Sequence, residues 1–197
     1  MTIRQYFTPM DFEHTKSLWS TTLKPGMEKA LKGSNEKDSF EELYRSAFTM
    51  VFNGHGQELY QNIQKLIFEY LVEKVRPKLA ESSSATFLVT LKQTWDDYEK
   101  SMLDIGKMLG YMNRVYITEK KLEPVYDLGL RLFRENIILF STTREYFNNA
   151  LREMMIREQH GEILDRTTIN DISLMLTKLN INEADFYDED LQTWCLQ

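Results

Sequence analysis

The sequence contains few of the residues that interrupt helices or cross-link loops. Among 197 residues there are 8 glycines, 4 prolines and one cysteine, Cys195. Glycine and proline therefore fall below their usual shares of about 7% and 5%, which disfavours a loop-rich fold. A single cysteine excludes an internal disulfide framework and favours a reducing compartment. We therefore expect a chain that is stabilised by an ordinary hydrophobic core.

Long hydrophobic runs and an excess of positive charge are also missing. No run of about 18 apolar residues occurs, and the N-terminus lacks the basic and then apolar layout of a signal peptide. The 24 lysines and arginines stand against 30 aspartates and glutamates, so the formal charge is 24 − 30 = −6. This charge argues against a nucleic-acid partner. We expect a soluble protein of the cytoplasm and nucleus, with no nucleic-acid or membrane partner.

Recognisable catalytic and metal-binding motifs are absent too. The three histidines, His14, His55 and His160, are far apart in the sequence, and solvated or capping roles fit them best. A carboxylate-bridged di-iron bundle would need paired Glu-x-x-His motifs, and none occurs. There is no glycine-rich phosphate loop and no Gly-x-Ser-x-Gly motif. The sequence therefore predicts no catalytic residue, no metal site and no cofactor.

The sequence does contain helical periodicity along nearly its whole length. Apolar residues recur at spacings of three and four, and alternating strand-like runs are few. Capping boxes predict helix starts at Ser39 with Glu42 and at Thr142 with Glu145. Pro25 removes a backbone donor and predicts a bend near Lys24. Chain breaks are predicted at residues 33–35, 53–56, 82–84, 123–124, 160–161 and 180–182. The expected fold is all-α, an elongated bundle of about seven or eight long helices.

The most regular pattern runs from Phe87 to Tyr116. It places one apolar seam along a long helix, or along two nearly collinear helices. The seam consists of Leu88, Leu91, Trp95, Tyr98, Met102, Ile105, Leu109, Met112 and Tyr116. Tyr111 and Arg114 lie off this seam and three residues apart, so both can face a partner while the seam is buried.

The segment from Phe40 to Phe52 has more apolar surface than one core-facing stripe requires. Its apolar side chains cover roughly 200° of the helix when each residue turns by about 100°. Either this helix is sandwiched within the core, or one flank is available to another protein. The aromatic flank of Tyr44, Phe48 and Phe52 favours the second interpretation, because rings with a polar tip suit binding surfaces.

Several separated motifs resemble the cullin family, above all the cullins that recruit BTB-domain adaptors. Residues 39–51, Ser-Phe-Glu-Glu-Leu-Tyr-Arg-Ser-Ala-Phe-Thr-Met-Val, resemble the second helix of that group. Residues 111–116, Tyr-Met-Asn-Arg-Val-Tyr, resemble its fifth helix, and residues 127–134 keep its Leu-Gly-Leu and Phe-Arg spacing. Residues 156–166 resemble the marker Glu-Arg-x-Gly-Glu-x-Ile-Asp-Arg, with conservative departures at Gln159 and Leu164. These motifs occur in the same order as in the family, and the resemblance covers essentially the whole chain from about residue 10.

The resemblance implies a fold of stacked cullin repeats. Residues 1–10 would form an N-terminal extension, residues 11–160 the first repeat, and residues 161–197 the start of a second, truncated repeat. It also implies a role as the non-catalytic scaffold of a RING-type ubiquitin ligase, whose N-terminal part docks a BTB-domain adaptor of the BTB-Kelch kind. The RING subunit would bind only through a C-terminal region that this sequence does not contain.

Residue by residue, the resemblance assigns adaptor contacts to two helices. They are Phe40, Glu41, Tyr44, Phe48, Tyr111 and Arg114. Phe48 stands where the group usually has tyrosine, and Asp38 replaces an apolar residue at the start of the helix. In the resembling group an N-terminal extension also contacts the adaptor, which implies further contacts at Ile3, Tyr6 and Phe7.

Other interpretations of the same sequence stay open at this point. The chain is either a fragment of a longer scaffold or a complete short paralogue that occupies adaptors unproductively as a competitor. An F-box-type adaptor is a second choice of partner. An unrelated helical protein-interaction module would be indicated if Phe40, Tyr44, Phe48, Tyr111 and Arg114 proved to be buried within the monomer.

Overall fold

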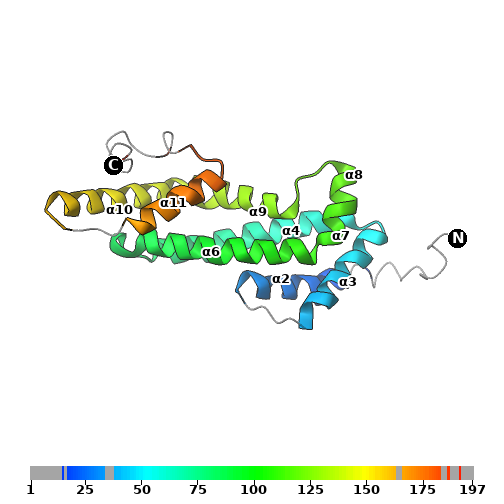
Figure 1. Cartoon of the computed structure of the whole chain (residues 1–197). Helices are drawn as coiled ribbons and strands as arrows, with labels where there is room; N and C mark the ends of the chain where they lie inside the picture. The colour runs from blue at the N-terminus through cyan, green and yellow to red at the C-terminus, as the bar shows by residue number, and fades with distance from the viewer. Residues whose placement is uncertain are drawn as a thin grey trace. The chain divides into compact units, whose positions relative to one another are not determined.

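The computed structural model describes residues 15, 17–33, 38–162, 166–182, 186 and 191, and its regular secondary structure is helical throughout (Figure 1). The all-α class predicted from the sequence is confirmed. In chain order the elements are η2 (Trp19–Leu23), α2 (Lys24–Leu31), α3 (Asp38–Phe52), α4 (Gly56–Tyr70), η3 (Leu71–Val75), α5 (Arg76–Ala80), α6 (Ser84–Met108), α7 (Gly110–Met112), η4 (Asn113–Ile117), α8 (Thr118–Lys120), α9 (Val125–Phe133), η5 (Arg134–Ile138), α10 (Ser141–Gln159) and α11 (Thr167–Lys178), where η marks a five-residue π-helical turn.

Local chemistry determines where several helices end. After α3, Gly54 adopts a left-handed conformation with φ of 88°. The His55 amide donates to the Met50 carbonyl at 2.9 Å, and the Gly54 amide donates to Val51 at 3.1 Å. These two bonds form a Schellman motif, which satisfies carbonyls that the helix end would leave without donors. Positive φ values also occur at predicted breaks, at Gly33, Gly161 and Asn180.

The residues just before Pro25 form the π-helical turn η2, which closes with the Lys24 amide donating to the Trp19 carbonyl. The bend predicted near Lys24 stays a prediction. The capping box at Thr142 is wrong. Helix α10 begins at Ser141 with Phe140 in the N-cap position, and no side chain caps it. The side chain of Ser39 lies outside the described residues.

Contacts group the chain into two compact units. Unit 1 comprises Met1–Ile67 and Glu99–Gly129, and unit 2 comprises Phe68–Tyr98 and Leu130–Gln197. Within unit 1, α2 and α3 approach closely, because a β-carbon on Gly26 would overlap the Leu43 side chain. The Tyr60 hydroxyl donates to the Glu123 carbonyl at 3.0 Å and ties α4 to the segment before α9. The buried core of unit 1 includes Leu23, Met27, Leu43, Met50, Leu59, Ile63, Ile105, Leu109, Met112 and Leu128.

The core of unit 2 contains an aromatic cluster. The Phe133 ring lies 5.1 Å from Trp95 and 5.0 Å from Tyr98, measured between ring centroids. All three side chains are buried. Burial raises the pKa of Tyr98 well above its ordinary value, and the neighbouring Tyr70 adds to this effect. Tyr98 is therefore neutral at physiological pH and packs as an apolar ring with a polar tip.

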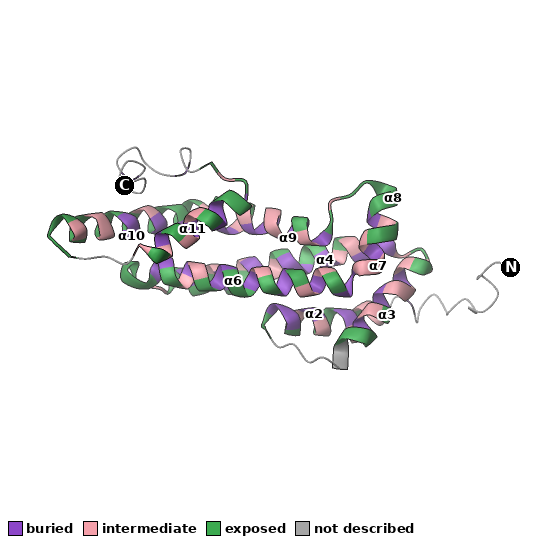
Figure 2. Ribbon diagram, in the orientation of Figure 1, coloured by how far each residue is buried: buried purple, intermediate pink, exposed green. Residues whose placement is uncertain are grey.

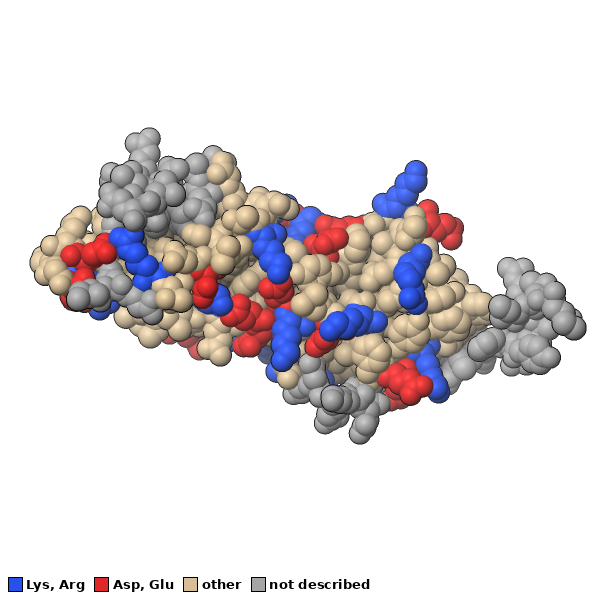
Figure 3. All heavy atoms as spheres, viewed as in Figure 1, with Lys and Arg blue, Asp and Glu red and all other residues tan. Residues whose placement is uncertain are grey.

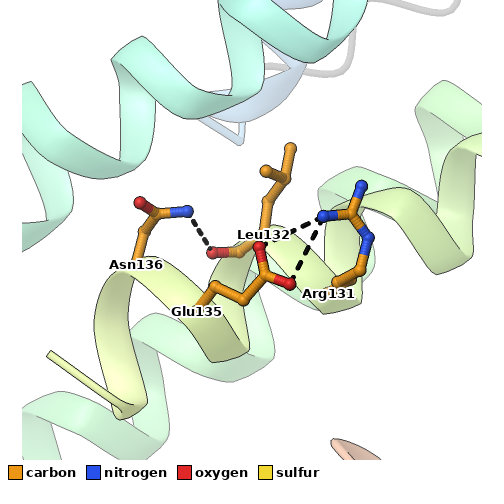
Figure 4. A network of polar contacts seen from close by, with 4 residues as sticks. All are labelled: Arg131, Leu132, Glu135 and Asn136. Atoms are coloured by element: carbon orange, nitrogen blue, oxygen red, sulfur yellow. Dashed lines mark hydrogen bonds and ion pairs between the residues drawn. The ribbon is translucent and has the colours of Figure 1, made fainter.

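Arg76 links the start of α5 to the end of the α9–η5 helix within unit 2. Its Nε donates to the Asn136 carbonyl at 2.8 Å, and its guanidinium lies 4.0 Å from the centroid of the Phe140 ring. Burial lowers the pKa of Arg76 from its ordinary value. Figure 4 shows the adjoining contact, in which the Asn136 amide donates to the Leu132 carbonyl at 2.9 Å.

The seam predicted between Leu88 and Tyr116 is confirmed as core. All of its members are buried except Tyr116, which is half-buried. The helix is interrupted once, at Leu109, whose φ of −94° and ψ of 18° separate α6 from α7. The seam is therefore carried by two successive helices and not by one, whereas their near-collinearity stays a prediction. Among the described residues no helix is long and apolar enough to cross a membrane.

Gly56 is a position where a side chain should not fit. A β-carbon there would overlap the Tyr116 ring, so Gly56→Ala should lower the free energy of unfolding by about 2 kcal/mol. Gly106→Ala is the matched control, because the nearest atom, Tyr126 Cβ, would be 3.8 Å away. Within α6 that change should stabilise the protein by up to about 1 kcal/mol. Urea unfolding followed by circular dichroism measures the stability change of each variant. Equal stabilities of the two variants would contradict the close packing of Gly56 against the Tyr116 ring.

Candidate functional site

Helices α3 and α7 lie against each other in unit 1 and bring the six predicted contact residues onto neighbouring elements (Figure 1). Tyr44, Phe48 and Tyr111 are half-buried, whereas Arg114 is exposed. Phe40 and Glu41 are also exposed, Phe40 to 40%. We call Phe40, Glu41, Tyr44, Phe48, Tyr111 and Arg114 together the α3/α7 face. None of its members is sealed within the monomer.

The opposite side of α3 anchors this face to the core. Leu43, Ala47 and Met50 are each at most 2% exposed, and Ser46 is buried beside them. Figure 2 shows the resulting mixture along α3 of buried positions with half-buried and exposed ones. Among the described residues, one flank of α3 is buried and the other is half-buried against α7 or exposed, so α3 is not sandwiched within the core.

Aromatic rings connect α3 to α7. The Phe48 ring meets Tyr111 edge to face, with centroids 4.5 Å apart and planes at 60°. On its own helix Phe48 also stacks on Phe52 at 5.6 Å. Phe52 is 42% exposed and extends the aromatic surface by one helical turn beyond the six predicted residues. Its spacing of four from Phe48 was the sequence signal for this extension.

A polar contact joins the same two segments beside the rings. Arg114 Nη2 donates to the Tyr44 hydroxyl at 3.1 Å, which links residues 70 positions apart. The Tyr44 ring lies over Gly110, where a β-carbon would be 3.8 Å from Tyr44 Cε2. A guanidinium has five N–H donors, and Tyr44 is the only hydrogen-bond partner of Arg114 among the described residues. Arg114 can therefore donate to an external group without losing Tyr44.

Glu41 pairs within its own helix. Arg45 Nη2 donates to Glu41 Oε1, and both side chains are about three-quarters exposed. Exposed pairs of this kind contribute roughly 0.3–0.5 kcal/mol. The pair leaves Glu41 accessible while fixing its direction, and its spacing of four was visible in the sequence.

Asn113 is a supporting residue that the sequence did not indicate. Its side-chain Nδ2 donates to the Gly106 carbonyl at 3.2 Å, and its side-chain Oδ1 accepts from the Val125 backbone amide at 3.2 Å. These bonds tie η4 both to α6 and to the start of α9. Because Asn113 lies between Tyr111 and Arg114, these bonds fix the backbone segment that carries both side chains.

The α3/α7 face is suited to recognition. Its rings supply apolar area with polar tips, and tyrosine and arginine are enriched among residues that dominate interface energies. Figure 3 shows mostly uncharged surface over the C-terminal part of α3 in this view. Within the described residues no group of three or more His, Cys, Asp or Glu side chains could hold a metal ion.

Of the two described histidines, His160 has the capping role that the sequence suggested, whereas the His55 side chain is only 11% exposed and pairs with a carboxylate. His55 Nδ1 donates to the Glu58 carboxylate at 3.2 Å at the start of α4. His160 Nδ1 donates to the Ile156 carbonyl at 2.7 Å at the end of α10. His14 lies outside the described residues. So do Ile3, Tyr6 and Phe7, the predicted contacts of the N-terminal extension, and the side chain of Asp38.

The described part of the chain is a helical protein that presents an accessible aromatic surface, the α3/α7 face. Residues 20–197 match the cullin alpha solenoid domain, and the chain belongs to the cullin family. It is 37% identical to Cullin-3 of Dictyostelium discoideum over 182 aligned residues. The aligned region covers 92% of this chain and 23% of that protein. It is 30% identical to Cullin-3 of Caenorhabditis elegans over 194 residues, which make up 98% of this chain and 25% of that protein.

Other cullins are similar at lower identity. Cullin-1 of Oryza sativa is 21% identical over 175 residues, which cover 85% of this chain and 23% of that protein. The chain spans about a quarter of the length of these relatives. The sequence is thus an N-terminal region of the Cullin-3 type.

Proposed function

We propose that this chain is the adaptor-docking part of a non-catalytic scaffold in a cullin-RING ubiquitin ligase. On this proposal the α3/α7 face binds a BTB-domain substrate adaptor, of the BTB-Kelch kind. The observation that carries the proposal is the joining of Tyr44, Phe48, Tyr111 and Arg114 into one accessible surface from two separate segments. The similarity to proteins named Cullin-3 supports the choice of adaptor.

The geometry of the face favours tight docking. Contacts within the monomer already fix the rings and the guanidinium, so little side-chain freedom remains to be lost on binding. The Phe48–Tyr111 and Tyr44–Arg114 contacts both fix side chains of α3 against the α7–η4 segment. Such preorganisation improves affinity without adding contact area.

The activity that follows from docking is positioning. A scaffold that holds a substrate adaptor at one place and a conjugating enzyme at another replaces a bimolecular encounter with an effectively intramolecular one. In this arrangement the chain supplies no reacting group. Its contribution is a stiff helical support for the adaptor.

The experiment that tests the proposal compares two adaptor classes by calorimetry. The purified chain should bind the BTB domain of a BTB-Kelch protein with one-to-one stoichiometry and a dissociation constant in the micromolar range or tighter. An F-box-type adaptor, titrated under the same conditions, should bind at least tenfold more weakly, which is about 1.4 kcal/mol. Absence of heat with every BTB domain tried, or preference for the F-box-type adaptor, would exclude this assignment.

A further inference from the structure

Two exposed apolar side chains continue the α3/α7 face beyond its six residues. Phe52 on α3 is 42% exposed, and its ring stacks on the Phe48 ring with centroids 5.6 Å apart. Val115 on η4 is 41% exposed and follows Tyr111 by four residues, which is about one helical turn. Each of the two thus extends one side of the contact between Phe48 and Tyr111. We call Phe52 and Val115 together the apolar end.

The two residues of the apolar end lie on neighbouring parts of the surface, because contacts join their segments both before and after them. Before them, Phe48 meets Tyr111 edge to face at 4.5 Å. After them, Gly56 lies against the Tyr116 ring, which a β-carbon on Gly56 would overlap. The α3 segment and the α7–η4 segment therefore run in the same general direction, and the apolar end falls between these two contacts on both.

The charges of these two segments lie away from the apolar end. The charged residues of α3 all belong to its first half, since residues 46–54 carry none. Between residues 110 and 118 the only charged residue is Arg114, whose Nη2 donates to the Tyr44 hydroxyl on the first half of α3. Figure 3 shows the mostly uncharged surface over the second half of α3. The combined surface is thus charged at one end and apolar at the other.

This gradient indicates which kind of side chain the apolar end accepts. A charged side chain placed against Phe52 would lose hydration without gaining a partner of opposite charge, which costs free energy. An apolar side chain would gain free energy from burial at the same place. The ring that receives it is already held by its stacking on Phe48.

We propose that the apolar end is a specificity-determining part of the docking surface and binds an apolar side chain of the BTB-domain adaptor. The inference rests on the proposed function, because continuity with the α3/α7 face is what identifies the occupant. Adaptors that present a charged side chain at this place are selected against, since that charge is left without a partner.

Calorimetry with a BTB domain that binds the unchanged chain tests the contribution of each residue. Phe52→Ala should weaken binding by about tenfold, whereas Phe52→Leu keeps most of the apolar area and should stay within about threefold. Val115→Thr preserves the shape of the side chain but buries a hydroxyl, so it should weaken binding by about fivefold. Phe52→Ala should also make the heat-capacity change of binding less negative, because less apolar surface is buried.

A pair of charged variants tests whether the occupant is apolar. Phe52→Glu and Phe52→Lys should both weaken binding by more than tenfold, since either charge would be buried against an apolar side chain. If one of the two binds as tightly as the unchanged chain, the adaptor presents a charge of opposite sign at this place. That result would overturn the proposal.

Two matched variants in unit 2 control for the loss of exposed apolar surface elsewhere. Phe68→Ala removes a ring that is 44% exposed on α4, and Val89→Thr changes a valine that is 56% exposed on α6. Both should bind the BTB domain within about twofold of the unchanged chain. Circular dichroism verifies that every variant folds.

The outcomes distinguish this inference from the proposed function. If Tyr44→Ala weakens binding while the variants of Phe52 and Val115 bind like the unchanged chain, the α3/α7 face docks the adaptor without the apolar end. The inference is then overturned and the proposed function stands. If the unchanged chain binds no BTB domain, the proposed function fails and the inference fails with it.

Discussion

Tyr44→Ala should weaken binding of a BTB domain by about 30-fold, or roughly 2 kcal/mol, while the fold stays intact. Tyr44 lies at the centre of the α3/α7 face, over Gly110, and its hydroxyl accepts from Arg114. Its removal deletes a half-exposed ring and also frees the Arg114 side chain, so both contact area and preorganisation are lost. Calorimetry with the same BTB domain measures the change.

Two further tyrosine variants make this measurement specific. Tyr44→Phe keeps the ring and removes only the acceptor of Arg114, so it should cost about 1 kcal/mol or fivefold. Tyr146→Ala removes a more exposed tyrosine ring from α10 in unit 2 and should leave BTB binding unchanged. If Tyr44→Ala binds as tightly as the unchanged chain, the α3/α7 face is not the docking surface. If Tyr146→Ala weakens binding equally, the loss is not specific to that face.

Phe133→Ala should reduce the free energy of unfolding by about 4 kcal/mol, the largest stability change that we predict. Phe133 has no exposed surface and packs between Trp95 and Tyr98 at centroid distances near 5 Å. Truncation removes the buried ring and leaves a cavity that its two large neighbours fill only in part. The loss should appear in urea unfolding followed by far-UV circular dichroism and by near-UV signals from the aromatic cluster.

Leu174→Ala is the matched control for this stability measurement. Leu174 lies on α11 of the same unit and is 69% exposed, so its truncation should change stability by less than about 0.5 kcal/mol. Phe133→Ala should also leave BTB binding largely unaffected at temperatures where the variant is folded. A loss for Phe133→Ala no larger than that for Leu174→Ala would contradict the packing of unit 2.

Helix positions could be predicted because the signals that determine them are local. The seam from Leu88 to Met112 is buried as its spacing indicated, and the break at Gly54 follows from the freedom of glycine at positive φ. The start of α10 shows the limit of this reasoning. Phe140 takes the N-cap position there, and the Arg76 guanidinium lies 4.0 Å from its ring. A contact between residues so distant in sequence can override a capping box, and no local pattern reveals it.

The sequence by itself determined that this chain is helical, where most of its helices end, and which residues resemble cullin adaptor contacts. Periodicity and capping depend on groups a few residues apart, so they can be read without coordinates. Only the tertiary structure decided which flank of α3 stays partly exposed and that Tyr44 meets Arg114, 70 residues away. The exposure of a face depends on which distant helices pack against it. That choice is made by the summed burial of many side chains and not by any single stretch of sequence.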